Sequence, residues 1–217
     1  MSLTLLFAHG WALDRTLWDR VLGALGDEAA GALVRDAGYY GRPFDPLAPF
    51  PHQGGQELRI LGVGQSLGAL KLLAEPPPGL LGVVALDGFA RFGKASDFPE
   101  GVPGRMLARM KARPGEGVLA DFVTRAGDEP PAGKPDFERL IQGLNELDAL
   151  DGRGSRLPIW RLHADRDPIA PLAMADASFA GMNVIERHIR PSADHLSPRT
   201  APHACAGLIR TALKALR

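Results

Sequence analysis

The chain has 217 residues, of which 45% are hydrophobic and 23% are charged, and its 25 basic side chains balance 25 acidic ones. These values are typical of one globular domain with a sizeable core, and they favour neither nucleic acid nor an anionic membrane as a partner. We therefore predict a single domain over residues 1–217, and the composition is compatible with a monomer.

The single cysteine, Cys205, excludes an intramolecular disulfide and is typical of a reducing compartment. The first residues, MSLTLLFAHGW, hold too few consecutive apolar residues for a signal peptide. No segment approaches the roughly 18 apolar residues of a membrane span. We therefore expect a cytoplasmic protein without a membrane span.

Short apolar runs alternate with helical patterns in the first part of the chain, which predicts an α/β fold with a mostly parallel sheet flanked by helices. The expected strands are Thr4–Ala8, Ala32–Val34, Leu58–Val63 and Leu81–Leu86. The expected helices are Leu13–Leu25 and Leu67–Ala74.

From about residue 88 to residue 156 no convincing β-like run appears, and helical patterns such as GVLADFVTRAG and PDFERLIQGLNELDAL follow one another. We interpret 88–156 as a helical lid inserted into the α/β domain. The strand pattern returns at Ile159–His163 and Val184–Ile189, and a closing helix is expected from about Ala201 to Leu216.

The segment LRILGVGQSLGAL carries Ser66 between an apolar strand and a helix, with a glycine two residues away on each side. A serine hydroxyl is a weak nucleophile that needs a neighbouring base and donors for the developing oxyanion. Glycines allow the sharp strand–turn–helix that exposes such a serine at a helix N-terminus. Ser66 is therefore the predicted nucleophile.

The base and its orienting acid are expected in loops that follow later strands, where open α/β sheets build their sites. His195 follows the strand in NVIERHIRPSADHLSP after a short loop and is the predicted base. Asp167, in the turn of WRLHADRDPIAP, is the predicted acid, with Asp165 and Asp87 as rivals. We expect Asp194 to be an exposed neighbour of the base.

The other histidines that we weighed fit structural or surface roles better than that of a base. His163 lies at a strand end, where a packed histidine is expected. His188 lies inside a strand pattern, His52 lies in a loop, and His203 lies near a helix start.

The oxyanion donors of such a site are the N–H after the nucleophile, which belongs to Leu67, and an N–H in the loop after the first strand. That loop reads AHGWALD, and Trp11 follows Gly10 in it. Trp11 N–H is therefore the predicted second donor, although a glycine turn beside a core tryptophan fits the same residues.

Taken together, LFAHGW, VGQSLGAL, LHADRDPIAP and ADHLSP resemble the α/β-hydrolase fold family over nearly the whole chain. Within it, the HGW loop and the lid segments resemble the pimeloyl-[acyl-carrier protein] methyl ester esterases of biotin synthesis. The resemblance implies a serine esterase that needs no cofactor. It also implies that the substrate is a small-molecule ester or an ester carried by an acyl-carrier protein.

The chain departs from that subgroup in three places. It begins directly at the first core strand, Gln65 stands where a tryptophan is common, and LDGFARF replaces a Ser-rich stretch. These departures leave the predicted triad intact and leave the substrate open.

The predicted lid contains a basic stretch between residues 104 and 114 without an acidic residue. A helix would align Arg105, Arg109 and Arg113 on one face, since they are spaced four residues apart. A solvated helix face is the simplest interpretation, but an acidic carrier protein would be attracted to this stripe. The resemblance favours carrier docking at these three arginines.

Other classes of site have little support in the sequence. No Cys/His cluster has the spacing of a metal site, and the glycines near Ser66 do not complete a dinucleotide-binding motif. The alternatives to the leading hypothesis are a broad short-chain carboxylesterase or acyl thioesterase with the same triad, and a non-hydrolytic receptor that binds a small ligand under the lid.

Overall fold

The computed structural model describes residues 3–47, 58–92, 108–109, 112, 115–129 and 131–217. Within them, six strands form one parallel sheet in the order β2-β1-β3-β4-β5-β6. The strand bounds are β1 Leu3–Ala8, β2 Leu33–Arg35, β3 Arg59–Gln65, β4 Leu80–Leu86, β5 Ile159–Ala164 and β6 Val184–Arg190.

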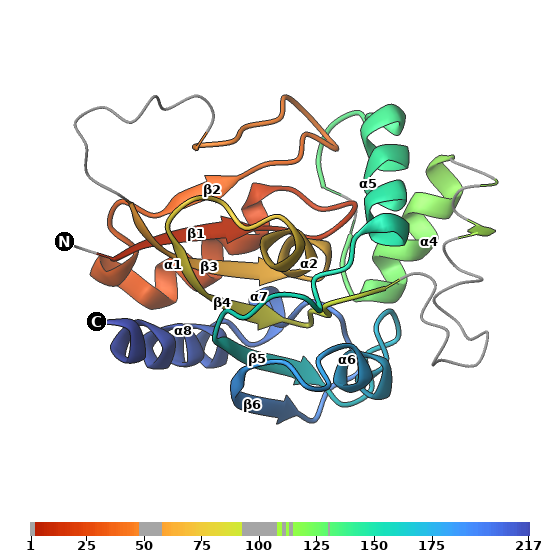
Figure 1. The fold of residues 1–217 in the computed structure, drawn as a ribbon. Coiled ribbons are helices and arrows are strands. Elements are labelled where there is room, and N and C mark those ends of the chain that lie inside the picture. Colours follow the sequence, from red (N-terminus) through yellow and green to blue (C-terminus); the bar gives the residue numbers. More distant parts are fainter. Residues whose placement is uncertain (1–2, 48–57, 93–107, 110–111, 113–114, 130) are drawn as a thin grey trace.

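Helices cover both faces of this sheet, as expected when parallel strands are buried on both sides. Successive residues of β1 alternate between two clusters, with Leu5 and Phe7 in one and Leu6 and Ala8 in the other. The helix bounds are α1 Asp19–Leu25, α2 Leu67–Ala74, α4 Glu116–Ala126, α5 Phe137–Ala149, α6 Leu172–Ser178, α7 Ser197–Thr200 and α8 Pro202–Leu216. Helices α1 and α8 pack together on one face, and α2 packs on the other (Figure 1).

All the strands predicted from the apolar runs are present, and the helix predicted after Ser66 has the same bounds as α2. The predicted helix Leu13–Leu25 is divided into a 3-10 turn, Arg15–Trp18, and α1, and Asp14 caps the turn through Thr16 N–H. The predicted closing helix is confirmed as α8, which begins at Pro202, where a proline is tolerated in the first turn.

Helices α4 and α5 lie beyond the carboxyl ends of the strands (Figure 1). In the described part of 88–156 the only β pairing is a single bridge between Arg91 and Asp151. The assignment of this segment as a lid stays a prediction. None of the described helices combines the length and the hydropathy that a bilayer span requires.

Candidate active site

Ser66 lies in a tight turn between β3 and α2, and its backbone adopts the strained angles φ 52° and ψ −120°. The flanking glycines permit this turn because neighbouring backbone lies against them. A Cβ on Gly64 would come within 2.4 Å of the Ala69 nitrogen, and one on Gly68 within 2.0 Å of the Ala8 oxygen. The turn therefore packs directly on the end of β1 and holds Ser66 at the start of α2.

The structure brings Ser66, His195 and Asp167 into one hydrogen-bonded line. Ser66 Oγ lies 2.8 Å from His195 Nε2, and His195 Nδ1 lies 2.6 Å from Asp167 Oδ2. All three residues are buried. Ser66 and His195 are more than a hundred residues apart in the chain, so the fold brings them together. The geometry matches that of a nucleophile, a base and an orienting acid.

The carboxylate of Asp167 is fixed by its own turn. Its Oδ1 accepts hydrogen bonds from the N–H groups of Ile169, at 2.8 Å, and Ala170, at 2.9 Å. These donors occupy one oxygen and leave Oδ2 for His195. The turn after β5 therefore sets the position from which the acid can orient the imidazole.

The electrostatic surroundings raise the pKa of His195 above its ordinary value of 6.5. Burial of the ring lowers this pKa, but the charge and hydrogen bond of Asp167, with the charges of Asp87 and Asp194, outweigh burial. The surroundings thus stabilise the imidazolium that forms when His195 takes a proton from Ser66.

The predicted oxyanion donors lie where the loop after β1 meets the nucleophile turn. Neither Trp11 N–H nor Leu67 N–H donates a hydrogen bond to any described residue. The loop is held by His9, whose Nδ1 lies 2.8 Å from Gly10 O and whose Nε2 accepts from Ala37 N–H. Leu67 directly follows Ser66, and the glycine that precedes Trp11 lies against Ser66 Cβ. Donors in this position with no partner among the described residues are what an oxyanion requires.

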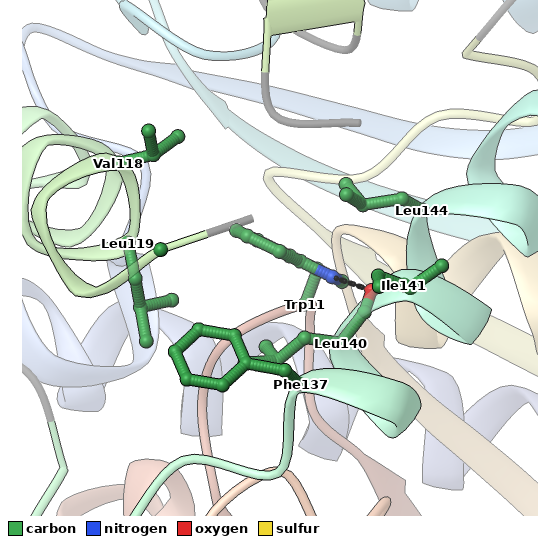
Figure 2. A pocket seen from close by; sticks show the side chains of 8 residues that line it. Trp11, Val118, Leu119, Phe137, Leu140, Ile141 and Leu144 are labelled. Atoms are coloured by element: carbon green, nitrogen blue, oxygen red, sulfur yellow. Dashed lines mark hydrogen bonds between the residues drawn. The ribbon is translucent and has the colours of Figure 1, made fainter. Parts of the chain in front are cut away.

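The indole of Trp11 joins this loop to the helices beyond the sheet. Its Nε1 donates to Leu140 O in α5 at 2.8 Å, and its ring contacts Phe122 of α4 edge-on. Figure 2 shows the indole between the two helices, at an apolar cavity of about 20 Å³. The side chains at this cavity come from Trp11, Val118, Leu119, Phe137, Leu140, Ile141 and Leu144.

Among the described contacts, Asp167 is the aspartate that hydrogen-bonds to His195, and the two rival acids have other partners. Asp87 is fully buried, and its carboxylate accepts from Ser197 N–H at 2.6 Å and Ser197 Oγ at 2.8 Å. Burial raises the pKa of Asp87. Asp165 binds Ser192 N–H at an exposed position. The expectation that Asp194 is exposed was wrong, since it is partly buried and paired with Arg190.

Of the other predicted non-catalytic histidines, one is packed in the interior and two lie at the surface. His163 is buried, with Nε2 donating to Ala170 O at 2.7 Å and lying 3.4 Å from Asp167 Oδ2. Burial lowers the pKa of His163. His188 pairs with Glu186 on the exposed edge strand β6, and His203 is exposed on α8. His52 lies outside the described residues.

Of the three lid arginines, only Arg109 falls within the described residues, and Arg105 and Arg113 lie outside them. Arg109 Nη2 lies 3.2 Å from Asp121 Oδ2 of α4. Although the sequence around Arg109 contains no acidic residue, the fold therefore places the carboxylate of Asp121 next to it. Docking of a carrier on these arginines stays a prediction.

Among the described residues, one group has the composition of a metal site: Asp87, His163 and Asp167 place ligand atoms within 4.8 Å of one another. Their atoms are already engaged by Ser197, Ala170, the turn after β5 and His195. A cation here would have to displace the hydrogen bond that orients His195. The donor set therefore fits a buried hydrogen-bond network better than a metal centre.

Two residues that contact the site were given no structural role by the sequence, although Gln65 was noted as a departure from the resembling subgroup. Gln65 Nε2 donates to the main-chain oxygen of His195 at 2.7 Å, and Ser197 binds Asp87. Neither contact has a sequence signal, because each joins segments more than a hundred residues apart.

Comparison with known proteins gives one curated relative and many structural neighbours. No family model matches the chain. The biotin biosynthesis bifunctional protein BioHC of Cellvibrio japonicus (strain Ueda107) is 28% identical over 209 residues, which cover 82% of this chain. The match spans 41% of that protein's own length.

Solved structures match nearly the whole chain. A lipase-esterase related protein from Clostridium acetobutylicum ATCC 824 has a TM-score of 0.71 at 17% identity, covering 96% of this chain and 93% of that one. An esterase from Thermogutta terrifontis gives 0.71 at 19% identity over 100% and 90%. The enol-lactonase from Burkholderia xenovorans LB400 gives 0.70 at 17% identity over 99% and 92%. With its parallel sheet and flanking helices, the chain has the α/β-hydrolase fold.

Proposed function

We propose that this chain is a serine carboxylesterase in which Ser66 is the nucleophile, His195 the general base and Asp167 the orienting acid. The observation that carries the proposal is the line Asp167–His195–Ser66, with contacts of 2.6 and 2.8 Å. The esterases among the structural neighbours and the curated relative at 28% identity support the same class of reaction.

In the proposed reaction, Ser66 Oγ attacks the ester carbonyl carbon while His195 Nε2 takes its proton. The carbonyl oxygen becomes an oxyanion held by Trp11 N–H and Leu67 N–H. The bond from the carbonyl carbon to the alkoxy oxygen then breaks, the imidazolium protonates that oxygen so that it leaves as the alcohol, and the acyl group stays on Ser66. A water molecule, deprotonated by His195, releases the carboxylic acid and restores the serine.

The proposed physiological substrate is pimeloyl-[acyl-carrier protein] methyl ester. Its support is the likeness of the HGW loop and lid segments to the esterases of biotin synthesis, and the match to a biotin biosynthesis protein. In this proposal the carrier docks on the basic stretch that contains Arg105, Arg109 and Arg113, and the cytoplasm is the site of action.

A specific observation favours a second candidate, a broad short-chain carboxylesterase or acyl thioesterase. The apolar cavity beside Trp11 measures about 20 Å³, which is room for about one water molecule. In this second proposal the acyl group enters that cavity, and a short acyl group fits it with less displacement of α4 and α5 than a pimeloyl chain would need.

The test of the catalytic proposal is turnover of p-nitrophenyl butyrate together with labelling by a fluorophosphonate probe. Ser66→Ala should lose at least about 10⁴-fold in kcat and all labelling. Ser178→Ala, which also truncates a buried serine, should retain both, because within the described part of the chain the Ser178 hydroxyl bonds to the main chain of Ala90 and Ala175 and not to the triad. An unlabelled wild-type chain that binds a small ligand tightly would instead support a receptor.

The substrate proposal is tested by growth without biotin in a strain that lacks its own methyl esterase. Restored growth that requires Ser66 supports the pimeloyl ester. Failure to restore growth, combined with good turnover of short p-nitrophenyl esters, supports the broad esterase.

A further inference from the structure

We infer that Gln65 is a positioning residue, which holds the loop of His195 and the loop after β1 in place around Ser66. The inference deepens the proposed function and rests on it, since it names the side chain that sets the base relative to the nucleophile.

The first observation is the contact between Gln65 and the main chain of the base. Gln65 is the last residue of β3, directly precedes Ser66, and is fully buried. Its Nε2 donates to the carbonyl oxygen of His195 at 2.7 Å. The residue beside the nucleophile is thus bonded to the backbone of the residue that carries the base.

The second observation lies at the other end of the same amide. A Cβ on Gly10 would come within 2.2 Å of Gln65 Oε1 and 3.0 Å of Ser66 Cβ. The amide therefore packs against the loop that carries the predicted oxyanion donor Trp11. Gln65 fills the space between this loop and the His195 loop, and contacts both.

The orientation of the Gln65 side-chain amide is determined by its hydrogen bond to the His195 carbonyl oxygen. Gln65 Oε1 is buried and has no hydrogen-bond partner among the described residues, which costs free energy. Turning the amide over would place that oxygen against the His195 carbonyl oxygen, so that two acceptors would face each other. The unpaired oxygen is therefore the consequence of directing Nε2 toward His195.

Helix α4 holds the main-chain N–H of the same residue, His195. The main-chain N–H of His195 donates to Ala126 O, the last residue of that helix, at 3.0 Å. Loss of the Gln65 bond would leave the His195 carbonyl without its partner and release one of the two anchors. A displacement of about 1 Å in a catalytic group can cost about 100-fold in rate.

Gln65 is not placed to contact substrate. Its side chain is fully buried, whereas part of Ser66 remains exposed. A positioning role predicts that its loss lowers kcat with little change in KM, whereas a substrate contact predicts a rise in KM.

The experiment compares Gln65→Met, which keeps the length of the side chain and removes the donor, with two controls. Gln142→Met makes the same change at an exposed position, and Ser178→Ala removes a buried hydrogen bond away from the triad. The measurements are kcat and KM for p-nitrophenyl butyrate, the midpoint of the acidic limb of the pH profile, and the low-field proton resonance of the His195 Nδ1–H bonded to Asp167.

Gln65→Met should lower kcat about 10- to 100-fold, with KM within about twofold of wild type. The midpoint of the acidic limb should fall, because a displaced His195 is farther from the charge of Asp167. The low-field resonance should move or broaden, and both controls should match wild type. If Gln65→Met does not fold, Gly10→Ala tests the same contact, because its added methyl group displaces the Gln65 amide while the native glutamine remains.

Unchanged kcat, midpoint and resonance in Gln65→Met would overturn the inference, as would a rise in KM at constant kcat. The resonance needs no substrate, so it separates this inference from the proposed function. A wild-type chain that turns over no ester but loses the resonance in Gln65→Met would contradict the esterase and retain the positioning role. A wild-type chain that hydrolyses esters, with a resonance that is unchanged in Gln65→Met, would support the esterase and contradict the positioning role.

Discussion

Two neighbouring strands, β4 and β5, each end close to a buried aspartate, yet the two loops use their carboxylates differently. Asp167, after β5, binds the imidazole of His195 and is held by two backbone N–H groups of its own turn. Asp87, after β4, is bound by the backbone and hydroxyl of Ser197. The comparison indicates that the partner of a buried carboxylate, rather than its burial or its place in the sheet, determines its role.

The largest effect expected from this comparison is on turnover. Asp167→Asn should lower kcat for p-nitrophenyl butyrate by about 10⁴-fold, because the amide no longer holds the required imidazole tautomer. Asp87→Asn should stay within about tenfold of wild type, since its carboxylate does not hold His195. Equal losses in the two variants would show that the two aspartates act as one unit.

The next effect concerns stability. Asp87→Ala should lower the free energy of unfolding by about 1–3 kcal/mol, because the N–H of Ser197 is left buried without its acceptor. Asp87→Asn should lose less, since its amide oxygen can still accept that N–H. Urea unfolding measures both, and a loss in Asp87→Asn as large as in Asp87→Ala would contradict the assigned bond.

A smaller effect is expected in the pH profile. Protonated His195 cannot accept the Ser66 proton, so kcat/KM should fall as the pH drops through a pKa that lies above 6.5. The charge of Asp87 helps to raise this pKa, so Asp87→Asn should move the midpoint to lower pH. A midpoint that moves upward in this variant would contradict the assigned direction.

The smallest effect is expected at the third aspartate. Asp165 is exposed, and among the described residues its carboxylate contacts Ser192 N–H and the side chain of Arg166. Asp165→Ala should leave both the midpoint of urea unfolding and kcat unchanged, because surface substitutions of this kind have small effects. A loss of activity comparable to that of Asp167→Asn would indicate that Asp165 is the orienting acid.

The sheet and the order of the site residues could be predicted because both depend on local patterns. Apolar runs mark the buried strands, and the glycines around Ser66 mark the turn. Parallel strands end at one edge, so Ser66, Asp167 and His195 could be expected together. The 28 residues that separate Asp167 from His195 leave room for one helix and one strand, and the structure has α6 and β6 there.

The remaining features depend on contacts between distant segments. No local pattern could assign Ser197 to Asp87, Asp121 to Arg109, or Gln65 to the carbonyl of His195. The choice between Asp167 and Asp87 likewise depends on which loop the imidazole meets. Sequence position alone leaves that choice open, because both residues follow buried parallel strands.

The hydrogen bond between the His195 amide and the end of α4 has a consequence for measurement. That amide hydrogen can exchange with deuterium only when the bond to Ala126 opens. Its exchange rate therefore reports how often the helix and the histidine loop separate in the native protein. A single residue thus carries the proposed base on its side chain and a deuterium probe of helix detachment on its backbone.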